Sequence, residues 1–163
     1  MGVTVTQTTN TSNHQRTDYD VDNVFLAYPS KQKYLTFVNG TASERTIAAG
    51  TLVGVLKSDP TIGQPVKSDG NDGSEVPQFV VLEDIVIPAG ASEEVEGLVG
   101  ENGIIYEDKV VLEKSGDTLN TVITGADSIV LGQSIRNALL NANSNIKLEA
   151  AAVQSSAVKD TQI

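Results

Sequence analysis

Apolar residues in the middle of the chain come in short runs rich in Val, Ile and Leu, separated by Gly, Pro, Asn and Asp. Residues 79–82, 85–87 and 109–112 are examples. β-Branched residues in runs of this length favour strands, and the turn formers between them indicate frequent chain reversals. The pattern therefore predicts a mainly β fold, a small barrel or sandwich of short strands.

Turn formers also divide the rest of this region. The sequence predicts an apolar strand within 45–56, a long surface loop over 58–77, strands over 76–83, 85–87, 95–99, 104–107 and 109–113, and a hairpin over 118–124.

One short helix is expected near the C-terminus. Ile135, Ala138, Leu139 and Ala142 recur at helical spacing, which predicts a helix over 133–142 that caps one end of the sheet. The alternation that follows predicts a closing strand over 146–153, and residues 154–163 are expected to form a polar tail.

The first 20 residues are polar and Thr-rich, so we expect a flexible N-terminal arm over 1–20 before a single β-rich domain over 21–153. Within the arm, Val3, Thr4, Val5 and Thr6 alternate apolar and polar side chains, as a strand does. Such a segment can add to the sheet edge of another protein. The alternative is an untethered tail.

Aromatic residues concentrate just after this arm. Phe25, Tyr28, Tyr34 and Phe37 are four of the seven Phe and Tyr residues, and Tyr19 lies shortly before them. We expect the arm to dock here. The alternative is a first hairpin of the core, with strands over 24–28 and 34–38.

Charge and composition narrow the possible functions. The formal net charge is −10, which is opposite in sign to what binding nucleic-acid phosphates requires. Most acidic residues between 75 and 117 are expected to form one solvated face. The chain has no Cys and no apolar stretch of transmembrane length, so we expect a soluble protein made in a cytoplasm, with no nucleic-acid or membrane partner.

The residue types that most enzymes and cofactor sites need are scarce. His14 is the only histidine and lies in the polar arm, and no Gly-rich phosphate loop is present. Either Glu83 with Asp84 or Glu93 with Glu94 could supply the carboxylate pair of a glycoside hydrolase, but a solvated acidic face explains these residues more simply. The sequence therefore predicts no catalytic residues and no cofactor.

Two Asp-rich stretches begin like calcium loops. The stretch starting at Asp18 has Pro29 in the twelfth position, and the one starting at Asp69 has Val80 there, so neither supplies the carboxylate that closes an EF-hand loop. No metal site is predicted, although a calcium site of another kind stays an alternative.

Three stretches in the middle of the chain resemble phage head decoration (capsid cement) proteins. They are Thr46-Ile-Ala-Ala-Gly-Thr-Leu-Val-Gly-Val-Leu, Pro77-Gln-Phe-Val-Val-Leu-Glu-Asp-Ile-Val-Ile-Pro-Ala-Gly and Glu94-Val-Glu-Gly-Leu-Val-Gly-Glu-Asn-Gly-Ile-Ile. The resemblance covers residues 46–113 and rests on aliphatic and Gly-based motifs.

This resemblance implies a structural virion protein, commonly trimeric, on the outer surface of an icosahedral capsid. Its N-terminal arm would pair with the major capsid protein and stabilise the shell. Carried over to this sequence, the capsid-binding residues are Val3, Thr4, Val5, Thr6, Tyr19, Phe25 and Tyr28. Two alternatives stay open: another virion part, such as a tail tube or head-fibre base, and a β-rich ligand-binding or adhesin module, which the low aromatic content of 4% disfavours.

Overall fold

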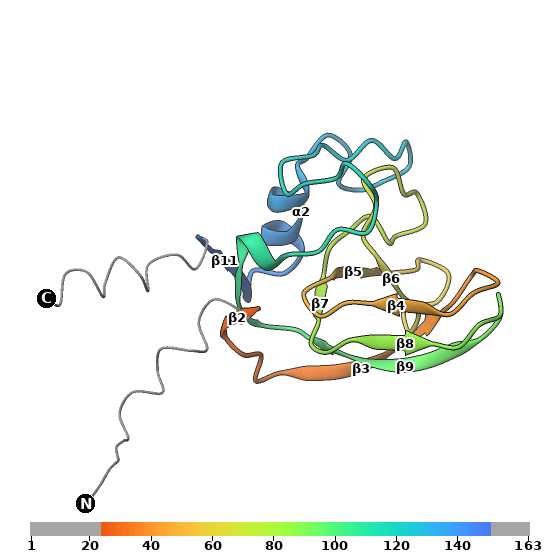
Figure 1. The fold of residues 1–163 in the computed structure, drawn as a ribbon. Helices are drawn as coiled ribbons and strands as arrows, with labels where there is room; N and C mark the ends of the chain where they lie inside the picture. Colours follow the sequence, from red (N-terminus) through yellow and green to blue (C-terminus); the bar gives the residue numbers. More distant parts are fainter. Residues whose placement is uncertain (1–23, 151–163) are drawn as a thin grey trace, which may run out of the picture.

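The computed structural model describes residues 24–150, and these form a mainly β fold with one α-helix near the C-terminus, as predicted (Figure 1). The elements are β2 (Phe25–Ala27), β3 (Gln32–Val38), β4 (Arg45–Ile47), β5 (Leu52–Val55), β6 (Gly63–Pro65), β7 (Phe79–Val81), β8 (Ile85–Ile87), β9 (Glu94–Gly100), β10 (Gly103–Tyr106), α2 (Ile135–Ala142) and β11 (Ile146–Glu149). None of the helices in this part of the chain has the length and apolarity needed to cross a membrane.

The largest sheet has five strands in the order β3-β9-β7-β5-β6. Its longest ladder joins β3 and β9 from Gln32 opposite Gly100 to Val38 opposite Glu94. The sheet curls so strongly that its two edge strands, β3 and β6, approach each other. The Thr36 N–H of β3 donates a hydrogen bond to the carbonyl of Thr61, which lies just before β6, at 2.9 Å. A single bridge joins these two edges, so the sheet does not close into a full barrel.

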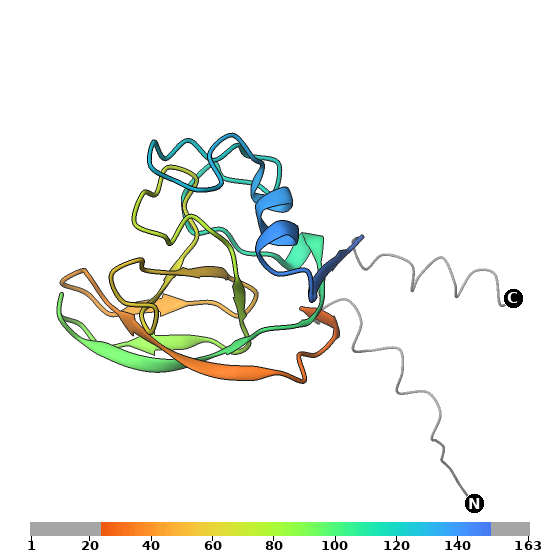
Figure 2. The same ribbon diagram turned by 180° about the vertical axis from the view of Figure 1, so that it is seen from behind.

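Two smaller sheets flank this one. β4 pairs with β8 in antiparallel fashion. A three-stranded sheet has the order β11-β10-β2, with β11 parallel and β2 antiparallel to β10. The two ends of the described chain therefore meet in one small sheet, which lies on the left in Figure 1 and on the right in Figure 2.

Two apolar clusters form the core. One includes Leu35, Phe37 and Ile87 and packs residues of the large sheet against the β4–β8 pair. The other includes Leu52 and Ile105 and packs residues of the sheets against α2 and the segments before it. Aliphatic side chains dominate both clusters, in keeping with an aromatic content of only 4%.

The predicted helix is confirmed, and its ends are fixed by side chains. The Ser134 hydroxyl accepts a hydrogen bond from the Asn137 N–H at 3.1 Å, which is a standard N-cap. At the other end the Asn143 amide donates to the carbonyls of Gln78 and Glu101, at 2.7 and 3.0 Å. The residues of α2 that face the core are Ile135, Ala138 and Leu139.

The apolar stretch over 45–56 forms two strands in different sheets, β4 and β5, and not one. The chain turns between them at Gly50, whose φ of 91° lies in the left-handed region. A Cβ on Gly50 would lie 2.6 Å from the Lys109 carbonyl oxygen, so close packing also requires glycine there.

Three other predictions were wrong in detail. The expected loop over 58–77 contains β6, residues 109–113 form no strand, and the expected hairpin over 118–124 is an irregular segment with one bridge to Ser134. In each case hydrogen bonds to distant parts of the chain decide the conformation. For example, Val111 exchanges backbone hydrogen bonds with Gly50 and Leu52.

Candidate functional site

The strand that follows the N-terminal arm lies at the edge of its sheet. β2 pairs with β10 on one side through Ala27 opposite Ile104 and Phe25 opposite Ile105. On its other side, no strand from residues 24–150 pairs with it. An edge strand presents unpaired N–H and C=O groups that can bind a further strand.

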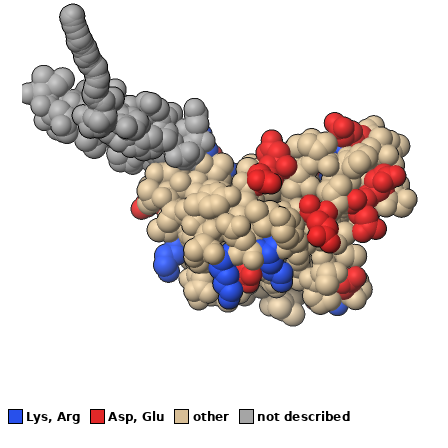
Figure 3. Space-filling model, turned by 90° about the horizontal axis from the view of Figure 1, so that it is seen from below, with Lys and Arg blue, Asp and Glu red and all other residues tan. Residues whose placement is uncertain are grey.

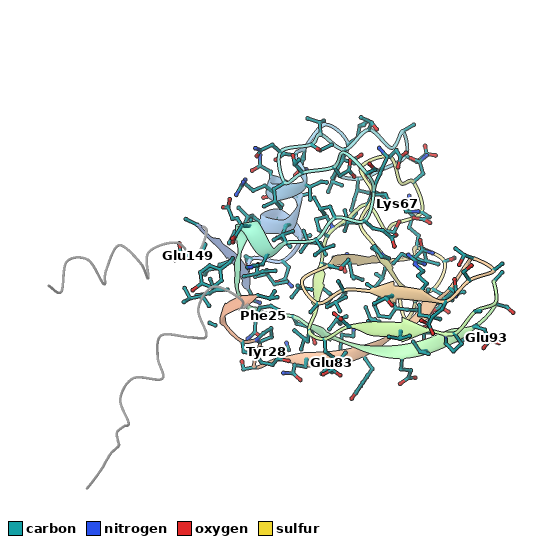
Figure 4. All side chains as sticks on the ribbon, viewed as in Figure 1. Phe25, Tyr28, Lys67, Glu83, Glu93 and Glu149 are labelled. Atoms are coloured by element: carbon teal, nitrogen blue, oxygen red, sulfur yellow. The ribbon has the colours of Figure 1, made fainter. Side chains whose placement is uncertain are left out.

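Large apolar side chains are exposed at this edge. Leu26 is 50% exposed and Tyr28 is 57% exposed. The ring of Tyr28 meets that of Phe25 edge-on, with centroids 5.3 Å apart, and Phe25 packs against the core cluster next to α2. We call β2 together with Tyr28 the β2 edge. The β2 edge therefore presents exposed apolar side chains on a paired strand. Figure 4 shows it at the same end of the molecule as Glu149.

The predicted capsid-binding residues divide into two groups. Val3, Thr4, Val5, Thr6 and Tyr19 lie outside the described residues, whereas Phe25 and Tyr28 come together at the β2 edge. The sequence did not single out Leu26. Its exposure depends on which face of β2 rests on the core, and that follows from the pairing with β10.

The alternative expectation of a first hairpin over 24–38 is wrong. β2 pairs with β10 and β3 pairs with β9, so the two strands belong to different sheets. Pro29 is buried between them and lies close to Gly100 and Gly103, which leave room for its ring. The segment after β2 is therefore a link between sheets, and β2 keeps a free edge.

The acidic span divides into solvated and buried residues. Glu83, Asp84, Glu93, Glu94 and Glu96 are exposed, and none forms an ion pair within residues 24–150. Seen from the side of β3 and β9, acidic and basic side chains gather over different parts of the surface (Figure 3). Glu75 contradicts the expectation of one solvated face, because it is fully buried and one carboxylate oxygen accepts from the Gly73 N–H at 2.9 Å.

The Asp-rich loop after β6 uses its polar side chains internally. The Asp72 carboxylate accepts from the N–H and the hydroxyl of Ser74 at 3.0 and 2.6 Å. Burial raises the pKa of Asp72, but these hydrogen bonds outweigh burial and leave the pKa below its ordinary value. Asn71 accepts from the Asp127 N–H at 3.1 Å, so this loop serves as a brace between two segments.

A hollow of about 540 Å³ lies beside the start of α2. Its charged lining residues are Glu107, Asp108, Asp117 and Arg136. The Arg136 guanidinium donates to both carboxylate oxygens of Glu107. These hydrogen bonds raise the pKa of Arg136. Because Glu107 already occupies the guanidinium, the hollow offers no unpaired cation to an anionic ligand.

Within residues 24–150, no group of three or more His, Asp or Glu side chains is placed to hold a metal ion. At the β2 edge, an edge strand and exposed apolar side chains coincide. Comparison with protein-family models, curated proteins and solved structures finds no match to this chain.

Proposed function

We propose that this chain is a capsid decoration protein, a non-enzymatic virion component that binds the outer surface of an icosahedral phage shell as a trimer and stabilises it. The observation that carries the proposal is the β2 edge, where an edge strand with exposed Leu26 and Tyr28 directly follows the N-terminal arm. The partner is the major capsid protein.

Binding by strand addition accounts for the sequence of the arm. Val3, Thr4, Val5 and Thr6 alternate in polarity, so one face of the added strand is apolar and meets the shell protein while the other faces water. Main-chain hydrogen bonds provide affinity, and the alternate side chains provide specificity. The exposed side chains of the β2 edge extend this contact on to the folded domain.

The acidic charge is consistent with a position outside the shell. A protein with a formal net charge of −10 gains nothing from contact with packaged nucleic acid, and its exposed carboxylates are well hydrated when they face solvent. Shell stabilisation needs no active site, so the function requires neither a cofactor nor a metal.

Deletion of residues 1–17 tests the proposal. We expect the shortened protein to keep the far-UV circular dichroism and melting temperature of the domain but to lose co-sedimentation with shells of the parent phage stripped of decoration proteins. Deletion of residues 154–163 is the matched control and should leave binding intact. Unchanged binding after removal of the arm would refute strand addition.

A second variant tests the β2 edge separately. Leu26→Asp with Tyr28→Ala removes exposed apolar surface and the ring contact of Tyr28 with Phe25, but it leaves Phe25 itself packed against the core, so the domain should still fold. Weaker shell binding by this variant is expected. Binding equal to that of the unaltered protein would confine the contact to the arm.

A further inference from the structure

Three further large apolar side chains are exposed in one segment far along the chain from the β2 edge. In the segment 118–134, Ile129 is 80% exposed, Leu131 is 53% exposed and Val122 is 48% exposed. We call these three residues the apolar tip. The segment lies at the top of Figures 1 and 2, on the side of the molecule opposite β3 and β9.

The backbone holds the apolar tip in place. Ile123 N–H donates to the Gln133 carbonyl at 2.8 Å, and Gly132 N–H donates to the Ile123 carbonyl at 2.9 Å. In a turn at Ser128, the Val130 N–H donates a hydrogen bond to the Ser128 hydroxyl oxygen at 3.2 Å. Exposure of these side chains is therefore a property of the fold, not of a loose loop.

Neighbouring apolar residues in the same segment are buried. Ile123 next to Val122, and Val130 between Ile129 and Leu131, belong to the core cluster around α2. Ile123 and Val130 are therefore buried in the core, whereas the three residues of the apolar tip stay exposed. Packing within residues 24–150 gives no reason for three large aliphatic side chains to face water there.

Charge indicates what covers the tip. Asp127 is the only Asp, Glu, Lys or Arg between Thr118 and Ile135, whereas the segment 83–96 carries five exposed carboxylates and no Lys or Arg. Two copies of a chain with a formal net charge of −10 repel each other wherever acidic faces meet. Because Asp127 is the one charged side chain in the tip segment, two copies can approach there with less repulsion than at residues 83–96.

We propose that the apolar tip is a contact between copies of this chain in solution. This inference rests on the oligomeric part of the proposed function and assigns a surface to it. A basic partner protein would instead be attracted to the acidic faces and not to the apolar tip. Self-association through the tip also leaves the β2 edge, at another end of the molecule, free for the shell.

The test is the solution mass of the full-length protein without shells, measured by light scattering and sedimentation over roughly 1 μM to 1 mM, the range that separates weak contacts from firm ones. The unaltered protein should reach a multiple of its 17.2 kDa chain mass. Ile129→Asp with Leu131→Asp places two carboxylates in the contact and should weaken association by about 100-fold or more.

The matched control is Tyr34→Asp with Val86→Asp, which adds the same charge at side chains that are 63% and 51% exposed, on β3 and β8. It should associate like the unaltered protein. All four positions are solvent-exposed, so circular dichroism and melting should show that both variants fold.

Three results would overturn the inference. They are an unaltered protein that stays monomeric throughout, a tip variant that associates normally, and a control variant that dissociates as fully as the tip variant. Shell binding is measured separately. A monomer that binds shells would refute the contact between copies at the tip but not the decoration function. An oligomer that does not bind shells would refute the decoration function but not the contact at the tip.

Discussion

Replacing Asn39 with Leu should destabilise the protein strongly, although the two side chains are similar in size. Asn39 is fully buried at the end of β3. Its amide nitrogen donates to the carbonyls of Ser43 and Pro88 at 2.7 and 2.6 Å, and its amide oxygen accepts from the Thr41 N–H at 2.9 Å. One side chain thus joins β3, the following turn and the end of β8.

The expected loss follows from the groups left behind. Leu has a similar branched shape but no polar atoms, so the Pro88 carbonyl and the Thr41 N–H are left without a partner, whereas the Ser43 carbonyl keeps its hydrogen bond from the Thr41 hydroxyl at 2.9 Å. An orphaned buried group costs about 1–3 kcal/mol. Because both bonds are only partly shielded from solvent, the lower end applies to each, and the total is about 2 kcal/mol. For a chain of this length that corresponds to a fall in melting temperature of roughly 4–8 °C.

Urea unfolding followed by circular dichroism measures this free energy directly. Asn120→Leu is the control, because Asn120 is exposed and changes there should cost less than about 0.5 kcal/mol. Asn39→Asp keeps the acceptor but turns a carboxylate toward two carbonyls, so it should cost at least as much as Leu. If Asn39→Leu were no more destabilising than Asn120→Leu, the hydrogen bonds of Asn39 would contribute no stability to the junction of β3, the following turn and β8.

Three further changes probe other parts of the fold. Ser134→Ala removes the N-cap of α2 and should cost about 1 kcal/mol in urea unfolding, whereas Ser134→Asp should restore it. Gly54→Ala would place a Cβ 2.5 Å from the Val76 carbonyl oxygen, so it should cost about 1–3 kcal/mol; a neutral effect would contradict this tight contact. The lowered pKa of Asp72 means that its hydrogen bonds stabilise the fold above the ordinary Asp pKa and that this contribution is lost as pH falls through its lower native value. Asp72→Asn should therefore be less stable than the unaltered protein at neutral pH, with the difference shrinking in acid; a difference that is constant with pH would refute the assignment.

The sequence correctly predicted those helices and strands that a short run of neighbouring residues is enough to specify. The spacing of Ile135, Ala138 and Leu139 predicted α2, since one face of a single helix is enough to produce that pattern. The β-branched runs likewise predicted β7, β8 and β10. The Val, Ile and Leu residues of these runs also supply much of both core clusters.

Pairing between distant segments could not be predicted in the same way. The sequence around β2 does not indicate that this strand pairs with β10 and not with the adjacent strand β3. Likewise, the sequence around Val111 does not indicate its backbone hydrogen bonds to Gly50 and Leu52. The same reason explains Glu75, which was expected on a solvated face but is buried where the loop after β6 packs. The sequence brought Phe25 and Tyr28 into the candidate site, but only the sheet order revealed a free edge beside them.

Co-sedimentation of the full-length protein with stripped shells of the parent phage tests the central proposal most directly. Decoration predicts saturable binding at a fixed number of copies per shell, together with shells that withstand higher temperature. A protein that stays in the supernatant at every concentration, or that binds without saturation, would contradict the proposed function.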